Sequence, residues 1–182
     1  MIAMKVLVAY ASKYGATEGI AQRIGETLTA RGLEVDVRRC KDLDEASGYD
    51  AYVVGSATYE FNWRKAARKF VTRNADELAA KPTWLFASGP VGAEKVDKDG
   101  NDVLKGAEPR QFEQYEERIH PRGKQVFMGA YDHDKIRGAD RIFTWMPVIR
   151  NVLPEGDYRE WDVIEAWASA IAQELQESAA RP

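Results

Sequence analysis

Short runs of apolar, β-branched residues alternate along this chain with stretches in which apolar residues recur every three or four positions. The runs predict strands. The first and third are almost continuously apolar, as expected for strands that are covered on both faces of a parallel sheet. The predicted strands are Lys5–Tyr10, Leu33–Arg39, Ala51–Ser56, Thr83–Ala87 and Gln125–Ala130.

The stretches between these runs predict amphipathic helices, because their apolar residues fall on one helical face. The first helix should end near Gly32, since glycine readily adopts the left-handed conformation of a helix C-terminus. The apolar stripes consist of Ile20, Ala21, Ile24 and Leu28; of Ala67, Phe70, Val71 and Leu78; of Phe112, Tyr115 and Ile119; and of Trp161, Ile164, Ala168, Ile171 and Leu175.

Five strands that alternate with helices predict a doubly wound α/β sandwich, in which right-handed crossovers place helices on both faces of a parallel sheet. At 182 residues the chain most simply forms a single domain, residues 1–182. Two extra loop segments, at about 90–108 and 131–158, lie outside the minimal alternation and are long enough to be functional.

Composition excludes several classes of function. The formal net charge of -3 argues against a nucleic-acid partner, because such proteins usually carry an excess of cations. The basic segment Arg64–Arg73 alternates with core positions and is interpreted as a solvated helix face. One cysteine, Cys40, excludes an intramolecular disulfide framework, fits a reducing compartment and is expected to be a small core or edge residue.

Metal and membrane sites are not predicted either. With two histidines and one cysteine a zinc site is improbable, and the acidic segment 97–108 lacks the glycine position of a calcium loop. No apolar run approaches the ~20 residues that span a bilayer. Because the first residues show no signal-peptide pattern, we expect a cytoplasmic protein without a transmembrane segment.

The segment "YASKYGATEG", residues 10–19, follows the first predicted strand. In an open α/β sheet, ligands bind beyond the carboxyl ends of the strands. Gly15 permits a tight turn, and Ser12 and Thr17 supply hydroxyl groups. The first turn of the helix that follows adds backbone N–H groups as further hydrogen-bond donors. Lys13 adds one cation. This combination predicts an anion site, most simply for a phosphate.

Three competing interpretations of this segment fail. It contains neither the G-x-G-x-x-G pattern of a dinucleotide site nor the G-x-x-x-x-G-K-S/T pattern of a nucleotide loop. A phosphorylatable receiver domain would need acidic residues after the first strand and an aspartate at the end of the third. Here Ala11 and Ser12 occupy the first place, and Gly55 and Ser56 the second.

The segment resembles the phosphate loop of flavodoxins, whose pattern is S/T-x-T-G-x-T. Ser12, Gly15 and Thr17 match this pattern, and Tyr14 stands where the family has threonine. The resemblance extends over essentially the whole chain. It implies a flavodoxin-like sheet of five parallel strands in the order 2-1-3-4-5, with the phosphate of flavin mononucleotide (FMN) on residues 12–17.

Within this superfamily the chain is most similar to the flavodoxin-domain group that contains the menaquinone-dependent protoporphyrinogen oxidase. The similarity lies in "YDAYVVGSATYEFNWRKAARKFV" (49–71), "FASGPVG" (86–92) and "FMGAYD" (127–132). Members of that oxidase type tend to carry a strongly basic, aromatic stretch after the fifth strand. In this chain the equivalent segment from Tyr131 is mixed in charge.

The flavin ring should then lie over the loops that leave the third and fourth strands. Tyr59 can stack on the ring, whereas Phe61 and Trp63 either join it or cap the next helix. The small residues after the fourth strand either let the backbone approach the ring or form an ordinary turn. The expected cofactor-binding residues are Ser12, Lys13, Tyr14, Gly15, Ala16 and Thr17; Ala57, Thr58, Tyr59 and Glu60; and Ser88, Gly89, Pro90, Val91 and Gly92.

Glu60 has a separate expected effect. Close to the ring, its carboxylate would oppose the anionic reduced flavin and lower the flavin's midpoint potential. An unchanged potential in Glu60→Gln would remove this hypothesis.

The resemblance implies an FMN-binding oxidoreductase that transfers electrons or hydride to a quinone or from a protoporphyrinogen. The alternative is a flavodoxin-type electron carrier that docks on a protein reductase, and a cofactor-free interaction domain is a third hypothesis. The sequence identifies no separate catalytic acid, base or nucleophile. Residues 131–158 are expected to form a wall or docking surface near the cofactor, and association with a second copy is left open.

Overall fold

The computed structural model describes residues 4–137 and 154–180. Five parallel strands form the central sheet in the order β2-β1-β3-β5-β6, which confirms the predicted order 2-1-3-4-5. The short strand β4 pairs antiparallel with the end of β3, and β7 pairs with β8 in a separate ribbon. The strands are β1 (Lys5–Ala11), β2 (Glu34–Arg39), β3 (Ala51–Tyr59), β4 (Asn62–Trp63), β5 (Thr83–Ser88), β6 (Gly123–Phe127), β7 (Ala130–Tyr131) and β8 (Gly156–Asp157).

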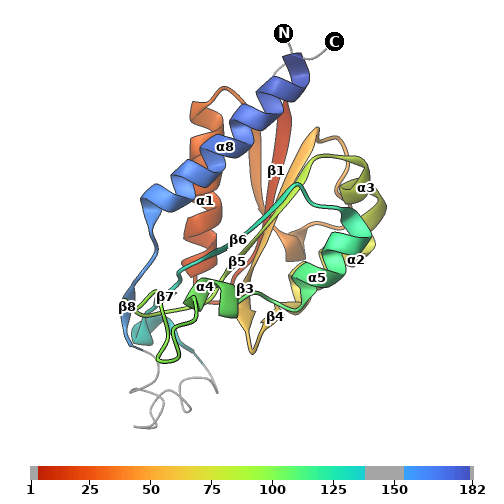
Figure 1. The fold of residues 1–182 in the computed structure, drawn as a ribbon. Helices are drawn as coiled ribbons and strands as arrows, with labels where there is room; N and C mark the ends of the chain where they lie inside the picture. The colour runs from red at the N-terminus through yellow and green to blue at the C-terminus, as the bar shows by residue number, and fades with distance from the viewer. Residues whose placement is uncertain (1–3, 138–153, 181–182) are drawn as a thin grey trace.

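Helices cover both faces of the sheet, with α1 and α8 on one side and α2, α3 and α5 on the other (Figure 1). Within residues 4–137 and 154–180, no helix combines the length and apolar composition needed to cross a bilayer. The helices are α1 (Ala16–Ala30), α2 (Lys65–Arg73), α3 (Ala75–Ala80), α4 (Val103–Gly106), α5 (Gln111–Ile119) and α8 (Trp161–Ala180), with single 3-10 turns at η1 (Cys40–Asp42) and η2 (His133–Lys135).

Alternation along the strands divides the core into two layers. In β1, Val6 and Val8 belong to the cluster under α1 and α8, whereas Leu7 and Ala9 belong to the cluster under α2, α3 and α5. All four side chains are fully buried. This explains why the run looks continuously apolar in sequence: both faces of the strand are covered.

The predicted helix stripe from Ala67 to Leu78 is wrong in one respect, because the structure divides it into α2 and α3 at Asn74. The Asn74 side chain donates to the carbonyl of Phe70 and accepts a bond from the backbone N–H of Ala46. An asparagine amide that bonds nearby backbone groups competes with helix continuation. Helical periodicity does not reveal a break of this kind.

The fifth predicted strand, Gln125–Ala130, is also corrected. The parallel strand ends at Phe127, and the chain then turns so that Ala130 pairs with Asp157 in the β7–β8 ribbon. The N–H of Gly129 bonds to the carbonyl of Pro90 at 2.7 Å, outside the sheet. The chain therefore leaves the sheet to pack on the loop that follows β5.

Two smaller expectations are confirmed. Cys40 lies in the core, where burial raises the pKa of its thiol to about 12. In the basic segment, Arg68 and Lys69 are exposed on α2 while Phe70 is buried. The first two basic residues of this segment, Arg64 and Lys65, instead border the cleft that is described below.

Candidate functional site

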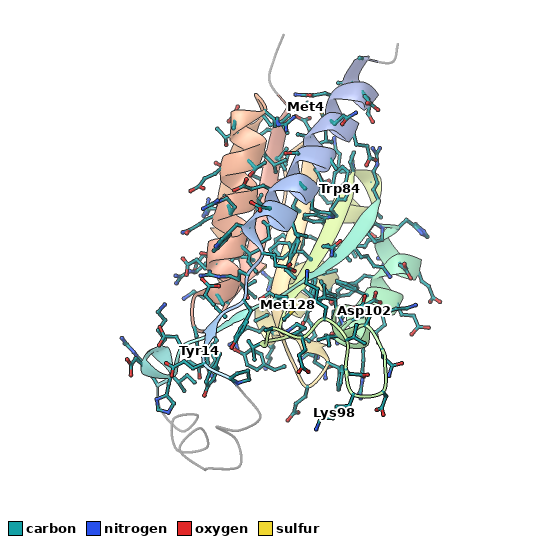
Figure 2. The ribbon with its side chains drawn as sticks, turned by 60° about the vertical axis from the view of Figure 1, so that its left-hand side comes forward. Met4, Tyr14, Trp84, Lys98, Asp102 and Met128 are labelled. Atoms are coloured by element: carbon teal, nitrogen blue, oxygen red, sulfur yellow. The ribbon has the colours of Figure 1, made fainter. Side chains whose placement is uncertain are left out.

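A cleft of about 850 Å³ opens at the carboxyl edge of the sheet, on the opposite end of the molecule from the termini. Figure 2 shows Tyr14 and Lys98 at this end and Met4 at the other. The cleft lies where β1, β3 and β5 end, which is where open α/β sheets bind ligands. The residues that border it are Ser12, Lys13, Tyr14, Ala16, Thr17, Ala57, Thr58, Tyr59, Glu60, Asn62, Trp63, Arg64, Lys65, Ser88, Gly89, Val91, Gly129, Ala130, Tyr131 and Ile136.

The loop between β1 and α1 forms one end of the cleft. Gly15 adopts a left-handed conformation with φ of 91°, which favours glycine, and its N–H donates to Ser12 Oγ at 3.1 Å. The hydroxyl hydrogen of Ser12 stays available to donate. The N-cap residue of α1 is Gly15, which has no side chain with which to satisfy the N–H groups of the first turn. A helix start of this kind favours an anion.

Thr17 joins this loop to the end of β5. Its side chain is 1% exposed, and its hydroxyl lies 3.3 Å from that of Ser88, which is also buried. Two hydroxyls that share one hydrogen leave a second hydrogen free to point elsewhere. In the same loop, the ammonium group of Lys13 lies 5.1 Å from the centre of the Tyr14 ring.

A hydrogen-bond cluster fixes the first turn of α1 against the sheet. The Tyr10 hydroxyl donates to Glu18 at 2.8 Å, and the Arg39 guanidinium donates to both oxygens of the same carboxylate at 3.0 and 3.1 Å. Burial alone would raise the pKa of Glu18, but the bonds from Tyr10 and Arg39 outweigh it and hold the pKa below the usual value of 4.5. The cluster connects β1, α1 and β2 behind the loop.

A two-residue hairpin between β3 and β4 forms the rim of the cleft. Both turn residues have positive φ, 49° at Glu60 and 62° at Phe61, as in a type I′ turn that usually carries Asn-Gly. The turn is fixed by bonds from Asn62 Nδ2 to the Glu60 carbonyl and from the Arg110 N–H to the Phe61 carbonyl. Tyr59 and Phe61 remain 46% and 52% exposed. The fold therefore holds two large aromatic side chains at the surface beside the cleft.

Three side chains that border the cleft have a buried polar atom without a hydrogen-bond partner in the described part of the structure: Thr58 Oγ1, Trp63 Nε1 and Tyr131 Oη. The Trp63 ring packs edge-on against Phe112 and Tyr115, with ring centres 5.9 and 5.5 Å apart. Trp63 is thus a core residue that also borders the cleft, whereas Phe61 stays outside both.

The loops after β5 and β6 also border the cleft. A Cβ placed on Gly89 would lie 3.4 Å from Thr58 Cβ, so the loop after β5 packs directly on the end of β3. Ala130 and Tyr131 of β7 border the cleft, and Ile136 follows them. Of the predicted wall segment 131–158, the structure describes only the two ends, because residues 138–153 lie outside the described part of the chain.

Most of the expected cofactor-binding residues come together at the cleft. The exceptions are Gly15, which forms the turn behind Ser12; Pro90, whose carbonyl bonds to Gly129; and Gly92, which lies near Pro154. Eight other residues border the cleft. Among them, Trp63 was one alternative for the ring site, and Tyr131 and Ile136 belong to the predicted wall segment. Sequence reasoning missed the other five, which are Asn62, Arg64, Lys65, Gly129 and Ala130.

Comparison with protein families finds that residues 7–152 match the model of the flavodoxin domain. Protoporphyrinogen IX dehydrogenase [quinone] of Escherichia coli (strain K12) is 24% identical over 177 residues, which cover 93% of this chain and 95% of that protein. The similarity therefore extends over nearly the full length of both chains.

Solved structures share the fold at lower sequence identity. A flavodoxin from the domain Archaea gives a TM-score of 0.59 at 18% identity, covering 95% of this chain and 99% of that one. Rubredoxin oxygen:oxidoreductase from Desulfovibrio gigas gives 0.65 at 15% identity, where 97% of this chain matches 37% of the larger protein. At these identities the likeness shows the fold alone.

Proposed function

Since the chain belongs to the flavodoxin domain family, we propose that it binds FMN without a covalent bond and acts as an oxidoreductase through it. In this proposal the electrons come from a donor such as a porphyrinogen and pass to a quinone. The name of the Escherichia coli relative supports this choice of donor and acceptor. The proposal depends on one observation: the cleft brings the start of α1 and the hydroxyls of Ser12 and Thr17 together with an exposed aromatic hairpin.

The residues present fit FMN. Ser12, Thr17 and the first turn of α1 would hold the phosphate, because hydroxyl and backbone N–H donors converge there. Tyr59 would cover the flavin ring, and the loop at Gly89 would follow its edge. A cleft of about 850 Å³ is of the size that cofactor sites have.

FMN would supply the electron-transfer chemistry, and the chain would bind it, orient it and exclude water. The Thr58 hydroxyl, which has no hydrogen-bond partner among the described residues, gives a specific prediction for the loop after β3. A buried donor without a partner is costly, so a polar atom supplied by the bound cofactor, or a small shift of the loop, would relieve it. Thr58 is therefore a candidate contact to the polar edge of the flavin.

The charge around the cleft favours an enzyme over an electron carrier. A carrier that docks on a reductase usually presents an acidic surface around its flavin. Among the described residues that border this cleft, three are cations, Lys13, Arg64 and Lys65, and the only carboxylate is Glu60. A cleft with an excess of positive charge attracts a small anionic electron donor and repels the basic surface of a protein reductase.

Purification and turnover test the proposal. The isolated protein should be yellow, with flavin absorbance, and should release FMN on denaturation. It should also oxidise protoporphyrinogen with menadione as acceptor and without any added reductase. A colourless protein that does not bind added FMN would reject the flavin site, whereas reduction only through a partner reductase would favour the carrier.

A further inference from the structure

Arg64 and Lys65 connect the hairpin to α2, and both border the cleft. Their position is fixed by the sheet, because the backbone N–H of Arg64 donates to Ser56 Oγ at 3.0 Å, and Ser56 is fully buried at the end of β3. The two cations therefore start from a rigid point at the carboxyl edge. They border the same cleft as the β1–α1 loop, but they come from a different segment, the one that joins β4 to α2.

Within residues 4–137 and 154–180, neither cation is neutralised by a carboxylate. Elsewhere on the surface, Arg118 pairs with Asp76 at 2.7 Å and Arg122 pairs with Glu174 at 3.0 Å. In the described residues no carboxylate forms an ion pair with Arg64 or Lys65. The Arg64 guanidinium instead lies over the ring of Tyr59, 5.7 Å from its centre. Two cations that have no carboxylate partner among the described residues, beside a ligand cleft in a chain of net charge -3, favour an anionic ligand.

The adjacent hairpin adds a large apolar surface. Phe61 is half exposed and lies outside the cleft, next to its rim, on a turn whose positive φ values disfavour non-glycine residues. Backbone strain that the surrounding bonds hold in place is characteristic of functional positions. The rim thus places aromatic surface next to two cations, a combination suited to a flat or macrocyclic molecule with carboxylate arms.

We propose that Arg64 and Lys65 determine substrate specificity by binding the carboxylates of an anionic tetrapyrrole donor, while its ring system lies against the Tyr59–Phe61 hairpin. This inference rests on the proposed function and names the residues that would select its substrate. It also locates the cations outside segment 131–147, which is mixed in charge in this chain. The two propionate groups of a protoporphyrin-type ring would each have one cation available.

The test compares protoporphyrin IX with its dimethyl ester, which has the same ring without the negative charges. Binding of each to the purified full-length protein is followed by porphyrin fluorescence in a neutral detergent. Because charge-assisted hydrogen bonds are strong, the wild type should bind the acid about tenfold or more tightly than the ester. The double variant Arg64→Gln/Lys65→Gln should reduce this preference to about threefold or less, and Arg64→Lys should retain most of it.

The matched control is Arg68→Gln/Lys69→Gln, which removes the same two charges one turn further along α2, at exposed positions that do not border the cleft. This control should keep the full preference for the acid. Equal loss in both double variants, an undiminished preference in Arg64→Gln/Lys65→Gln, or no binding of the acid by the wild type would each overturn the inference. FMN content is measured on the same samples, and its absence would count against the proposed function while the acid–ester comparison still decides the role of Arg64 and Lys65.

Discussion

The hydroxyl of Thr17 lies where the β1–α1 loop meets the end of β5, within 3.3 Å of the Ser88 hydroxyl. If it donates to the phosphate, Thr17→Ala should weaken FMN binding by about 1–3 kcal/mol, because the buried donor is lost. Riboflavin, which has no phosphate, should lose much less affinity. Titration of the apoprotein with each flavin measures the difference.

Ser88→Ala is the control for this change, since it removes the other member of the hydroxyl pair without removing the donor assigned to the phosphate. The ratio of FMN to riboflavin affinity should stay close to that of the wild type. Equal weakening of both flavins in Thr17→Ala would contradict the assignment and give Thr17 a purely structural role.

At the scale of elements, the β3–β4 hairpin is held in a conformation that its residues disfavour. At position 61, with φ of 62°, glycine avoids the steric cost that a side chain incurs in the left-handed region. Phe61→Gly should therefore be more stable than Phe61→Ala by about 1 kcal/mol in denaturant unfolding. At the exposed α2 position Lys69 the order should reverse, because alanine is the better helix former.

The stability order at position 61 is decisive because both variants remove the same aromatic side chain. If alanine proved as stable as glycine there, the turn would not have the positive φ that defines its shape. The comparison also separates the backbone strain from the apolar contacts of Phe61, which both variants lose.

The cluster of Tyr10, Glu18 and Arg39 connects three elements behind the phosphate loop, and its contribution should depend on pH. The pKa of Glu18 is lower in the folded protein than the usual 4.5, so its carboxylate stabilises the fold above that pH and the stabilisation is lost as the pH falls through the folded pKa. Glu18→Gln should lower the free energy of unfolding by about 0.5–1.5 kcal/mol at pH 7.

As the pH falls through the lowered pKa of Glu18 in the folded state, the two proteins should converge, because the protonated carboxyl group resembles glutamine. Urea unfolding of both proteins between pH 3 and pH 7 measures this trend. A difference that stays constant over the whole range would mean that the Glu18 charge contributes nothing.

The elements also show what sequence reasoning could and could not reach. Strands such as β1 were predictable because their apolar residues report burial directly. The break at Asn74 was not, since it depends on a bond to Ala46, 28 positions away. Arg64 and Lys65 were assigned to a solvated helix face because periodicity predicts that a helix is present. It does not predict that the start of this helix lies beside the cleft.

For the whole molecule, the cleft is assembled from parts that are distant in sequence. Ser12, Tyr59 and Gly89 approach one another only because β1, β3 and β5 lie side by side in the sheet, and Gly129 joins them by its bond to the loop after β5. The loops after β1, β3 and β5 could each be predicted from sequence to border the cleft. The position of β7 could not, because it depends on the bond between Gly129 and Pro90, which are distant in sequence. A ligand of this cleft should consequently bind the native state and not the unfolded chain.

This coupling gives the last prediction, a stabilisation of the entire fold by FMN. At a free concentration of 100 times its dissociation constant, a ligand that binds only the native state adds about 2.7 kcal/mol to the free energy of unfolding. For a chain of this size that corresponds to a rise of about 5–10 °C in Tm. The Tm of the apoprotein should increase with the logarithm of FMN concentration, measured by calorimetry or circular dichroism. In Thr17→Ala the same curve should shift to higher FMN concentration, because the weaker site needs more ligand for equal stabilisation. A Tm that does not respond to FMN would mean that the three strand ends do not form one binding site.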